Sequence, residues 1–113
     1  MELGICTSTR GSTVVVAVTG DIDIHTAPQL EQCLAGLLAE GRTEVVVDLA
    51  GVSFLDSSAL GVLIEARTKL EDRTTFLLAA PGLETHRALS ISGLDQHLAV
   101  HDTVDAALAA KLN

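Results

Sequence analysis

The sequence predicts a single α/β domain in which helices pack on a mixed β-sheet. Two runs of β-branched residues, 13–19 and 44–49, are typical of buried strands. Between and after these runs, apolar residues recur three and four positions apart, as they do in amphipathic helices. Strand and helix signals alternate, and no linker or repeat interrupts them. We therefore expect one domain over residues 1–113, with about four to five strands and about four helices.

The elements are expected in the order β-β-α-β-α-β-α-β-α. Strands are predicted at 2–8, 13–19, 44–49, 74–79 and 98–100, and helices at 26–40, from about 60 to 70, at 83–91 and at 103–112. Pro28 fits the first turn of the first helix, where its missing N–H costs nothing, and Gly41 fits the position after its end. Gly20 is expected to end its strand, and a short loop is expected to follow Leu49.

Composition narrows the classes of function. The formal net charge is −8, from 15 acidic and 7 basic residues. Such a surface repels phosphate backbones and anionic lipids, so nucleic acid and membranes are poor partners. Two Phe and no Trp or Tyr leave few aromatic platforms for bases or flat cofactors. A basic protein surface is the better partner.

The two cysteines do not indicate a disulfide framework. Cys6 and Cys33 come with neither a secretory leader nor dense cysteine spacing. No stretch is long and apolar enough to be a membrane span. A cytoplasmic location is therefore expected, with Cys33 packed on a helix rather than reactive.

The most informative segment lies where a buried strand leads into an apolar helix. Asp56, Ser57 and Ser58 are three consecutive residues that can each cap a helix. Because a helix needs only one N-cap, a hydroxyl can be left exposed beside the orphan N–H groups and the positive dipole end. A phosphoryl group can be stabilised there, and Asp56 would repel it. From the residues alone, plain capping is the simpler interpretation.

Several motifs resemble those of the STAS domain family, the sulfate transporter and anti-sigma factor antagonist domains. The segments 47–49 and 52–61 (VDL and VSFLDSSALG) are similar to the family signature. The segment 19–23 (TGDID) resembles the turn that follows a strand in the family, and Thr26-Ala27 opens the first long helix in the same way. The segment 92–94 (SGL) resembles a late turn. The likeness covers nearly the whole chain and implies one STAS domain over 1–113.

The resemblance implies an anti-sigma factor antagonist that works by partner switching. In this scheme the unphosphorylated protein binds an anti-sigma factor, which is itself a serine kinase. Phosphorylation of the serine after the aspartate ends binding, and a serine phosphatase reverses it. By this correspondence Ser57 is the phosphorylation site, and partner contacts are implied at Asp21, Asp23, Thr26, Asp56, Ser57 and Ser58. The implied role is bacterial transcription regulation in a stress response, without catalysis.

One residue departs from the family pattern. The family usually has glycine after the two serines, and this chain has Ala59. Alanine is the better helix former, so it is expected to stiffen the first turn. Its methyl group is expected to add bulk near the docking site.

A metal site near the first helix is an alternative. Asp21, Asp23 and His25 alternate, and an extended chain would place them on one side, as in a metal site. A polar turn that leads to a helix cap at His25 or Thr26 is the simpler interpretation. We expect no metal or cofactor here.

A second possible metal site uses the late histidines. His97 and His101 are four residues apart and Asp102 follows, a spacing that binds zinc on a helix. The strand-like residues between them weaken this interpretation. His86 is expected on a helix surface.

Two other functions remain open. A STAS domain can be a scaffold or regulatory subunit of a stress-sensing complex or of a transport system. A small enzyme that uses Ser57 or the histidines is less favoured, because the nucleophile-elbow pattern is absent around Ser57, and the chain lacks a P-loop and a dinucleotide fingerprint.

Overall fold

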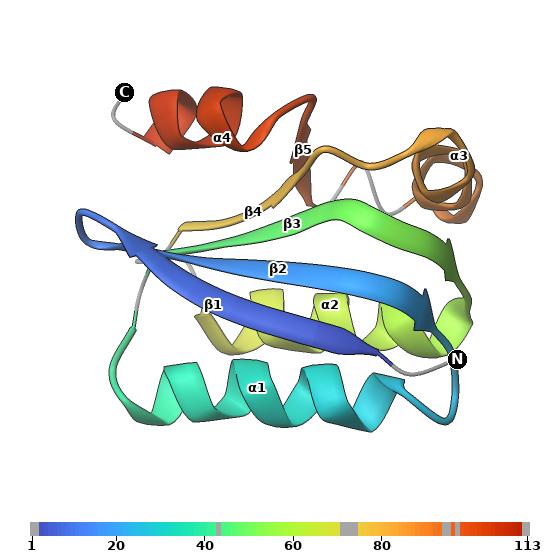
Figure 1. The fold of residues 1–113 in the computed structure, drawn as a ribbon, viewed down its shortest axis with the longest axis horizontal. Coiled ribbons are helices and arrows are strands. Elements are labelled where there is room, and N and C mark those ends of the chain that lie inside the picture. Colours follow the sequence, from blue (N-terminus) through green and yellow to red (C-terminus); the bar gives the residue numbers. More distant parts are fainter. Residues whose placement is uncertain (1–2, 43, 71–74, 94–95, 97, 112–113) are drawn as a thin grey trace.

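The computed structural model describes residues 3–42, 44–70, 75–93, 96 and 98–111. The elements follow the predicted order (Figure 1): β1 (Gly4–Arg10), β2 (Thr13–Ile22), α1 (Ala27–Ala39), β3 (Glu44–Leu55), α2 (Ser57–Leu70), β4 (Thr75–Ala79), α3 (Leu83–Ser92), β5 (Ala99–His101) and α4 (Val104–Lys111). The predicted element ends at residues 2, 74 and 112 lie outside the described residues.

The five strands form one mixed sheet in the order β1-β2-β3-β4-β5. β1 pairs antiparallel with β2, and every other neighbouring pair is parallel. The carboxyl ends of β2 to β5 therefore point the same way. The chain enters α1, α2, α3 and α4 from these four ends (Figure 1). In open α/β sheets this is the side on which binding sites form.

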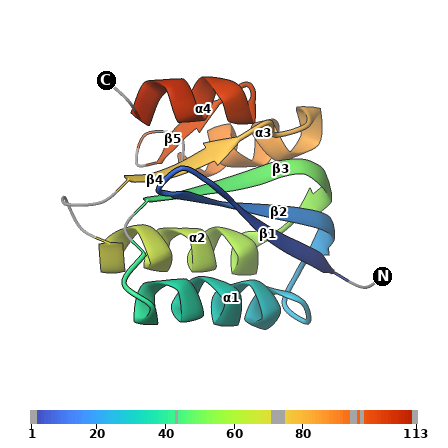
Figure 2. The ribbon, with the colours of Figure 1, turned by 60° about the vertical axis from the view of Figure 1, so that its left-hand side comes forward.

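Helices cover the sheet on both faces. α1 and α2 lie side by side on one face, and α4 lies on the other (Figure 2). Alternate β2 and β3 residues, Val14, Val16, Val45 and Val47 among them, belong to the main core with buried residues of α1 and α2. Their neighbours on the opposite face pack against Ala107 of α4. Cover on both faces explains the unbroken apolar runs in these strands, Val14–Val18 in β2 and Val45–Val47 in β3.

Two strands run further than predicted. β2 continues past Gly20 to Ile22, and β3 continues past Leu49 to Leu55, where Ile22 and Leu55 are register partners. The predictions that Gly20 ends its strand and that a loop follows Leu49 were wrong. Register shifts between residues 17 and 19 and between 20 and 21 interrupt the alternation of buried and exposed residues. Gly20 has a φ of +99°, a conformation that favours glycine.

The extended part of the β2–β3 ladder needs a close approach at Thr19. Thr19 is in register with Gly4 on β1 and with Gly51 on β3. A Cβ placed on Gly51 would lie 2.5 Å from Cγ2 of Thr19 and 3.1 Å from the carbonyl oxygen of Val18. A Cβ on Gly4 would lie 2.5 Å from Oγ1 of Thr19. The two glycines therefore make room for this threonine.

The ends of α1 agree with the sequence. Thr26 occupies the N-cap position and Pro28 lies in the first turn. After the C-cap Glu40, Gly41 has a φ of +83° and its N–H donates to the carbonyl oxygen of Leu38. The predicted first-turn proline and terminating glycine of this helix are confirmed.

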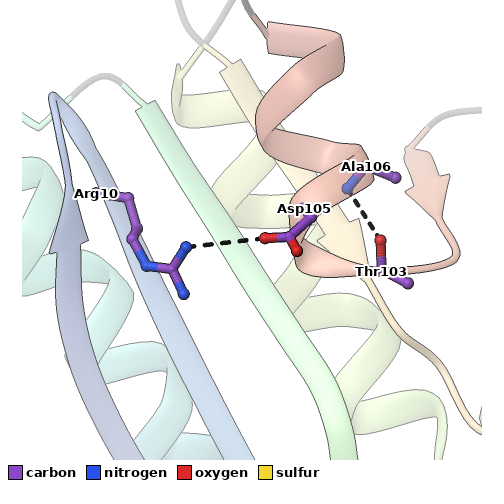
Figure 3. Close-up of polar contacts among 4 residues, drawn as sticks. All are labelled: Arg10, Thr103, Asp105 and Ala106. Carbon is purple, nitrogen blue, oxygen red and sulfur yellow. Dashed lines mark hydrogen bonds and ion pairs between the residues drawn. The ribbon is translucent and has the colours of Figure 1, made fainter.

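An ion pair joins α4 to the first hairpin, and a local hydrogen bond caps the start of this helix (Figure 3). A nitrogen of Arg10 on β1 lies 3.8 Å from a carboxylate oxygen of Asp105 in the first turn of α4. Both side chains are largely exposed, so this ion pair contributes little stability. The hydroxyl oxygen of Thr103 accepts a hydrogen bond of 2.9 Å from the N–H of Ala106 and caps the helix.

The cysteines are free thiols. Cys6 on β1 is exposed, and Cys33 on α1 is partly buried against the main core. Burial raises the pKa of the Cys33 thiol above its ordinary value, which keeps it protonated at neutral pH. The prediction that Cys33 packs on a helix is confirmed.

Candidate functional site: the start of helix α2

Two segments that are distant in sequence meet at the carboxyl ends of β2 and β3. The N–H of Asp56 donates a hydrogen bond of 3.1 Å to the carbonyl oxygen of Ile22. This bond follows directly on the register pair of Ile22 and Leu55. The loop from Asp23 to Thr26 therefore begins beside the first residues of α2. The structure brings together the two motifs that the sequence singled out.

Asp56 caps α2. Its Oδ1 accepts hydrogen bonds from the N–H of Ser58 at 2.8 Å and, at the longer distance of 3.4 Å, from the N–H of Ala59. Its carbonyl oxygen accepts the first helical bond, from Leu60 at 3.2 Å. A carboxylate at this place also interacts favourably with the positive end of the helix dipole. The cap of α2 is thus supplied without either serine hydroxyl.

Ser57 is the first residue of α2, and it is exposed. Within the described part of the chain, its hydroxyl takes part in no hydrogen bond. Ser58 is partly buried, so Ser57 is the more exposed of the two serines. The predicted arrangement, in which one of three capping residues is used and a hydroxyl is left exposed, is confirmed. Its phosphorylation stays a prediction.

Hydrogen bonds within the loop before α1 fix its shape. Oδ1 of Asp23 accepts from the N–H of His25 at 2.9 Å and from the N–H of Thr26 at 3.1 Å. The N–H of Asp23 donates back to the Thr26 hydroxyl at 2.9 Å, and this hydroxyl donates to the carbonyl oxygen of Asp21 at 2.8 Å. The bonds from His25 and Thr26 lower the pKa of Asp23, because they stabilise the carboxylate.

This network changes the expected role of Thr26. Thr26 is only 7% exposed, and its hydroxyl is occupied on both sides by the loop. A direct partner contact through its side chain does not fit this burial, so we assign it the role of holding the loop. Asp21 and Asp23 are partly exposed and remain predicted contacts.

Ala59 does not face the docking side. Its side chain is fully buried and belongs to the main core. The prediction that its methyl group adds bulk near the docking site was wrong, because the first turn of α2 points this residue at the sheet. The methyl group instead fills core space that glycine would leave empty.

The predicted alternatives for metal binding find little support in the geometry. Among the described residues, no three His, Cys, Asp or Glu side chains are grouped as metal ligands would be. His101 lies in strand β5, which removes the helical spacing, and His97 is outside the described residues. His86 is exposed on α3, as predicted.

In the part of the chain that the structure describes, no helix combines the length and the apolar character needed to cross a bilayer.

Sequence reasoning missed a hollow beside the site. It lies between the end of β3 and α3, and its lining residues are Phe54, Leu55, Glu84, Arg87, Ala88 and Ile91. We call it the β3–α3 groove. Phe54 lies in β3, beyond the strand predicted at 44–49. No sequence pattern indicates that α3 packs beside this end of β3 (Figure 1).

The fold and the site define a class: a small α/β domain with a capped helix start that presents a free serine hydroxyl next to an acidic loop. The chain belongs to the STAS domain family, whose sequence model matches residues 5–107. The expected family and fold are confirmed.

Proteins similar to this chain over nearly its whole length carry related names. The chain is 30% identical over 107 residues to the anti-sigma-F factor antagonist RsfB of Mycobacterium tuberculosis, which covers 95% of this chain and 88% of the relative. It is 33% identical over 104 residues to an anti-sigma-B factor antagonist of Staphylococcus epidermidis, which covers 90% of this chain and 95% of the relative. The crystal structure of an anti-sigma factor antagonist from Mycobacterium paratuberculosis has a TM-score of 0.94 and 34% identity, and covers 99% of this chain and 96% of that one.

Proposed function

We propose that this chain is an anti-sigma factor antagonist that is switched off by phosphorylation of Ser57. The unphosphorylated form binds an anti-sigma factor that is also a serine kinase, and a serine phosphatase restores the binding form. The observation that carries the proposal is the exposed Ser57 hydroxyl at the start of a helix that Asp56 already caps. The names of relatives at 30 to 34% identity support it.

A phosphate on Ser57 would alter the surface more than the fold. The two N–H groups that follow Ser57 both donate to Asp56. They cannot hold a phosphoryl group without releasing the cap. The added charge of about −1.5 to −2 is also repelled by the Asp56 carboxylate. The phosphate is therefore expected to point into solvent, where it changes which protein can dock.

The surroundings of Ser57 are suited to a basic partner. Asp21, Asp23 and Asp56 lie at the ends of β2 and β3 close to Ser57, and the whole chain carries a net charge of −8. Opposite charges across an interface speed association and suppress wrong partners. We infer a cytoplasmic regulatory protein that acts on transcription through this protein contact, not through nucleic acid or a membrane and not by catalysis, with residues 1–113 as one domain.

Phosphotransfer tests the proposal. The chain is incubated with ATP and the anti-sigma factor kinase encoded in the same genome, and the site is mapped by mass spectrometry. Wild type and Ser58→Ala should gain one phosphate on Ser57. Ser57→Ala should gain none and should still bind the kinase. A phosphate on Ser58, or a Ser57→Ala variant that is phosphorylated as well as wild type, would contradict the proposal.

A further inference from the structure

The β3–α3 groove exposes apolar side chains in one hollow. Phe54 is 52% exposed and Ile91 is 79% exposed, and Leu55 and Ala88 complete the apolar part of the lining. Single exposed apolar residues are ordinary on protein surfaces. Exposed apolar residues that share a concave surface, with a charged rim, are typical of a binding surface.

The groove continues the proposed docking site. Phe54 is the register partner of Asp21 across the β2–β3 ladder, and it precedes Asp56 by two residues. The loop from β2 that carries Ile24, another exposed apolar residue, is joined to the same place by the hydrogen bond between Asp56 and Ile22. A protein large enough to cover Ser57 would therefore also meet the groove.

The charges around the groove indicate the chemistry of its occupant. Arg87 on the rim is paired with Glu84 at 3.6 Å, so this cation is already compensated. Asp21 and Asp56 make the adjoining surface acidic. A second copy of this chain, with its own net charge of −8, is repelled by such a surface. A partner that presents an apolar side chain surrounded by basic residues fits both the apolar groove and the acidic surface beside it.

We propose that the β3–α3 groove is the apolar half of the docking surface and receives an apolar side chain of the anti-sigma factor. The basic residues around that side chain face Asp21 and Asp56. The inference rests on the proposed function, because it takes the anti-sigma factor as the occupant. Ser57 then carries the switch, and the apolar lining of the groove, which includes Phe54 and Ile91, supplies affinity.

The test is a titration of the anti-sigma factor of the same genome, without ATP, into variants of the chain. Ile91→Ser should weaken binding about tenfold, as truncation of a buried interface side chain does. Phe54→Ser should have a similar effect. Leu83→Ser is the matched control, because Leu83 lies on the same helix, is 75% exposed and is outside the groove lining. Its affinity should stay within about twofold of wild type.

The outcomes separate this inference from the proposed function. If Ser57→Asp weakens binding but Ile91→Ser binds as tightly as Leu83→Ser, the groove inference is overturned and the proposed function stands. If wild type binds no anti-sigma factor, both are overturned. Light scattering that shows a wild-type dimer and a monomeric Ile91→Ser would assign the groove to a second copy, which also overturns the inference. Because Ile91 is largely exposed, Ile91→Ser should fold as wild type does, and circular dichroism checks this.

Discussion

Replacing the cap of α2 tests how this site is built. Asp56→Ala removes the oxygen that accepts hydrogen bonds from Ser58 and Ala59. It leaves in place the backbone bond from the Asp56 N–H to Ile22, because that bond does not use the side chain. The change therefore isolates the side-chain cap. Asp56→Asn is the matched variant, since an amide oxygen can still cap while the charge is lost.

The expected size of the effect follows from the geometry. One of the two capping bonds is short, at 2.8 Å, and the other is long, at 3.4 Å, so the cap resembles an ordinary single-bond N-cap. Loss of such a cap costs about 1 kcal/mol. Loss of the carboxylate charge at the helix start adds about 0.3 to 1 kcal/mol. We expect Asp56→Ala to lower the free energy of unfolding by about 1.5 kcal/mol, and Asp56→Asn by about 0.5 kcal/mol.

Urea denaturation and thermal unfolding measure this difference. For a domain of this size, about 1.5 kcal/mol corresponds to a fall in Tm of roughly 5 to 9 °C. The slope of the urea transition should not change, because the surface exposed on unfolding is the same. An Asp56→Ala variant as stable as wild type, or an Asp56→Asn variant as unstable as Asp56→Ala, would refute the reasoning.

Three further predictions concern the neighbouring residues. Gly51→Ala should lower the free energy of unfolding by about 1 to 3 kcal/mol, because the new Cβ would meet Thr19. Adding Thr19→Ser to the same chain should restore part of this stability, as measured by urea denaturation. Ala59→Gly should cost about 2 kcal/mol, from helix propensity and a lost buried methyl group, yet leave partner affinity within about twofold by titration. The Asp23 carboxyl should titrate by NMR below its ordinary value of 3.8. Because the pKa of Asp23 is lower in the folded than in the unfolded chain, this carboxylate stabilises the fold above pH 3.8, and the stabilisation is lost as pH falls through the folded pKa. A titration midpoint at or above 3.8 would contradict the loop network.

The order of the elements could be predicted because buried strands and amphipathic helices leave different periods in the sequence. The length of β3 could not. Beyond Leu49 its buried residues are Val52 and Leu55, three positions apart, because register shifts interrupt the alternation. A strand with this spacing does not look like a strand in the sequence. The close approach of Thr19 to Gly51 depends on pairing across strands, which no local pattern reveals.

Part of the site was visible in the sequence because three capping residues stand next to one another. Which of them caps is a matter of geometry, and the structure gives that place to Asp56. The burial of Thr26 also could not be read from the sequence, because it depends on the folded loop, in which the Thr26 hydroxyl is held between Asp21 and Asp23. The β3–α3 groove depends on packing between Phe54 and a helix that follows much later in the chain.

Binding of the phosphorylated chain to the anti-sigma factor tests the central claim most directly. The protein is prepared with a phosphate on Ser57 and compared with the unmodified form by titration with the anti-sigma factor and by urea denaturation. The account predicts that the phosphorylated form binds the anti-sigma factor at least about tenfold more weakly, a loss of only about 1.4 kcal/mol of binding free energy. The free energy of unfolding of the two forms should be almost the same. Equal affinity for the two forms would contradict it, as would a loss of binding that comes only from unfolding.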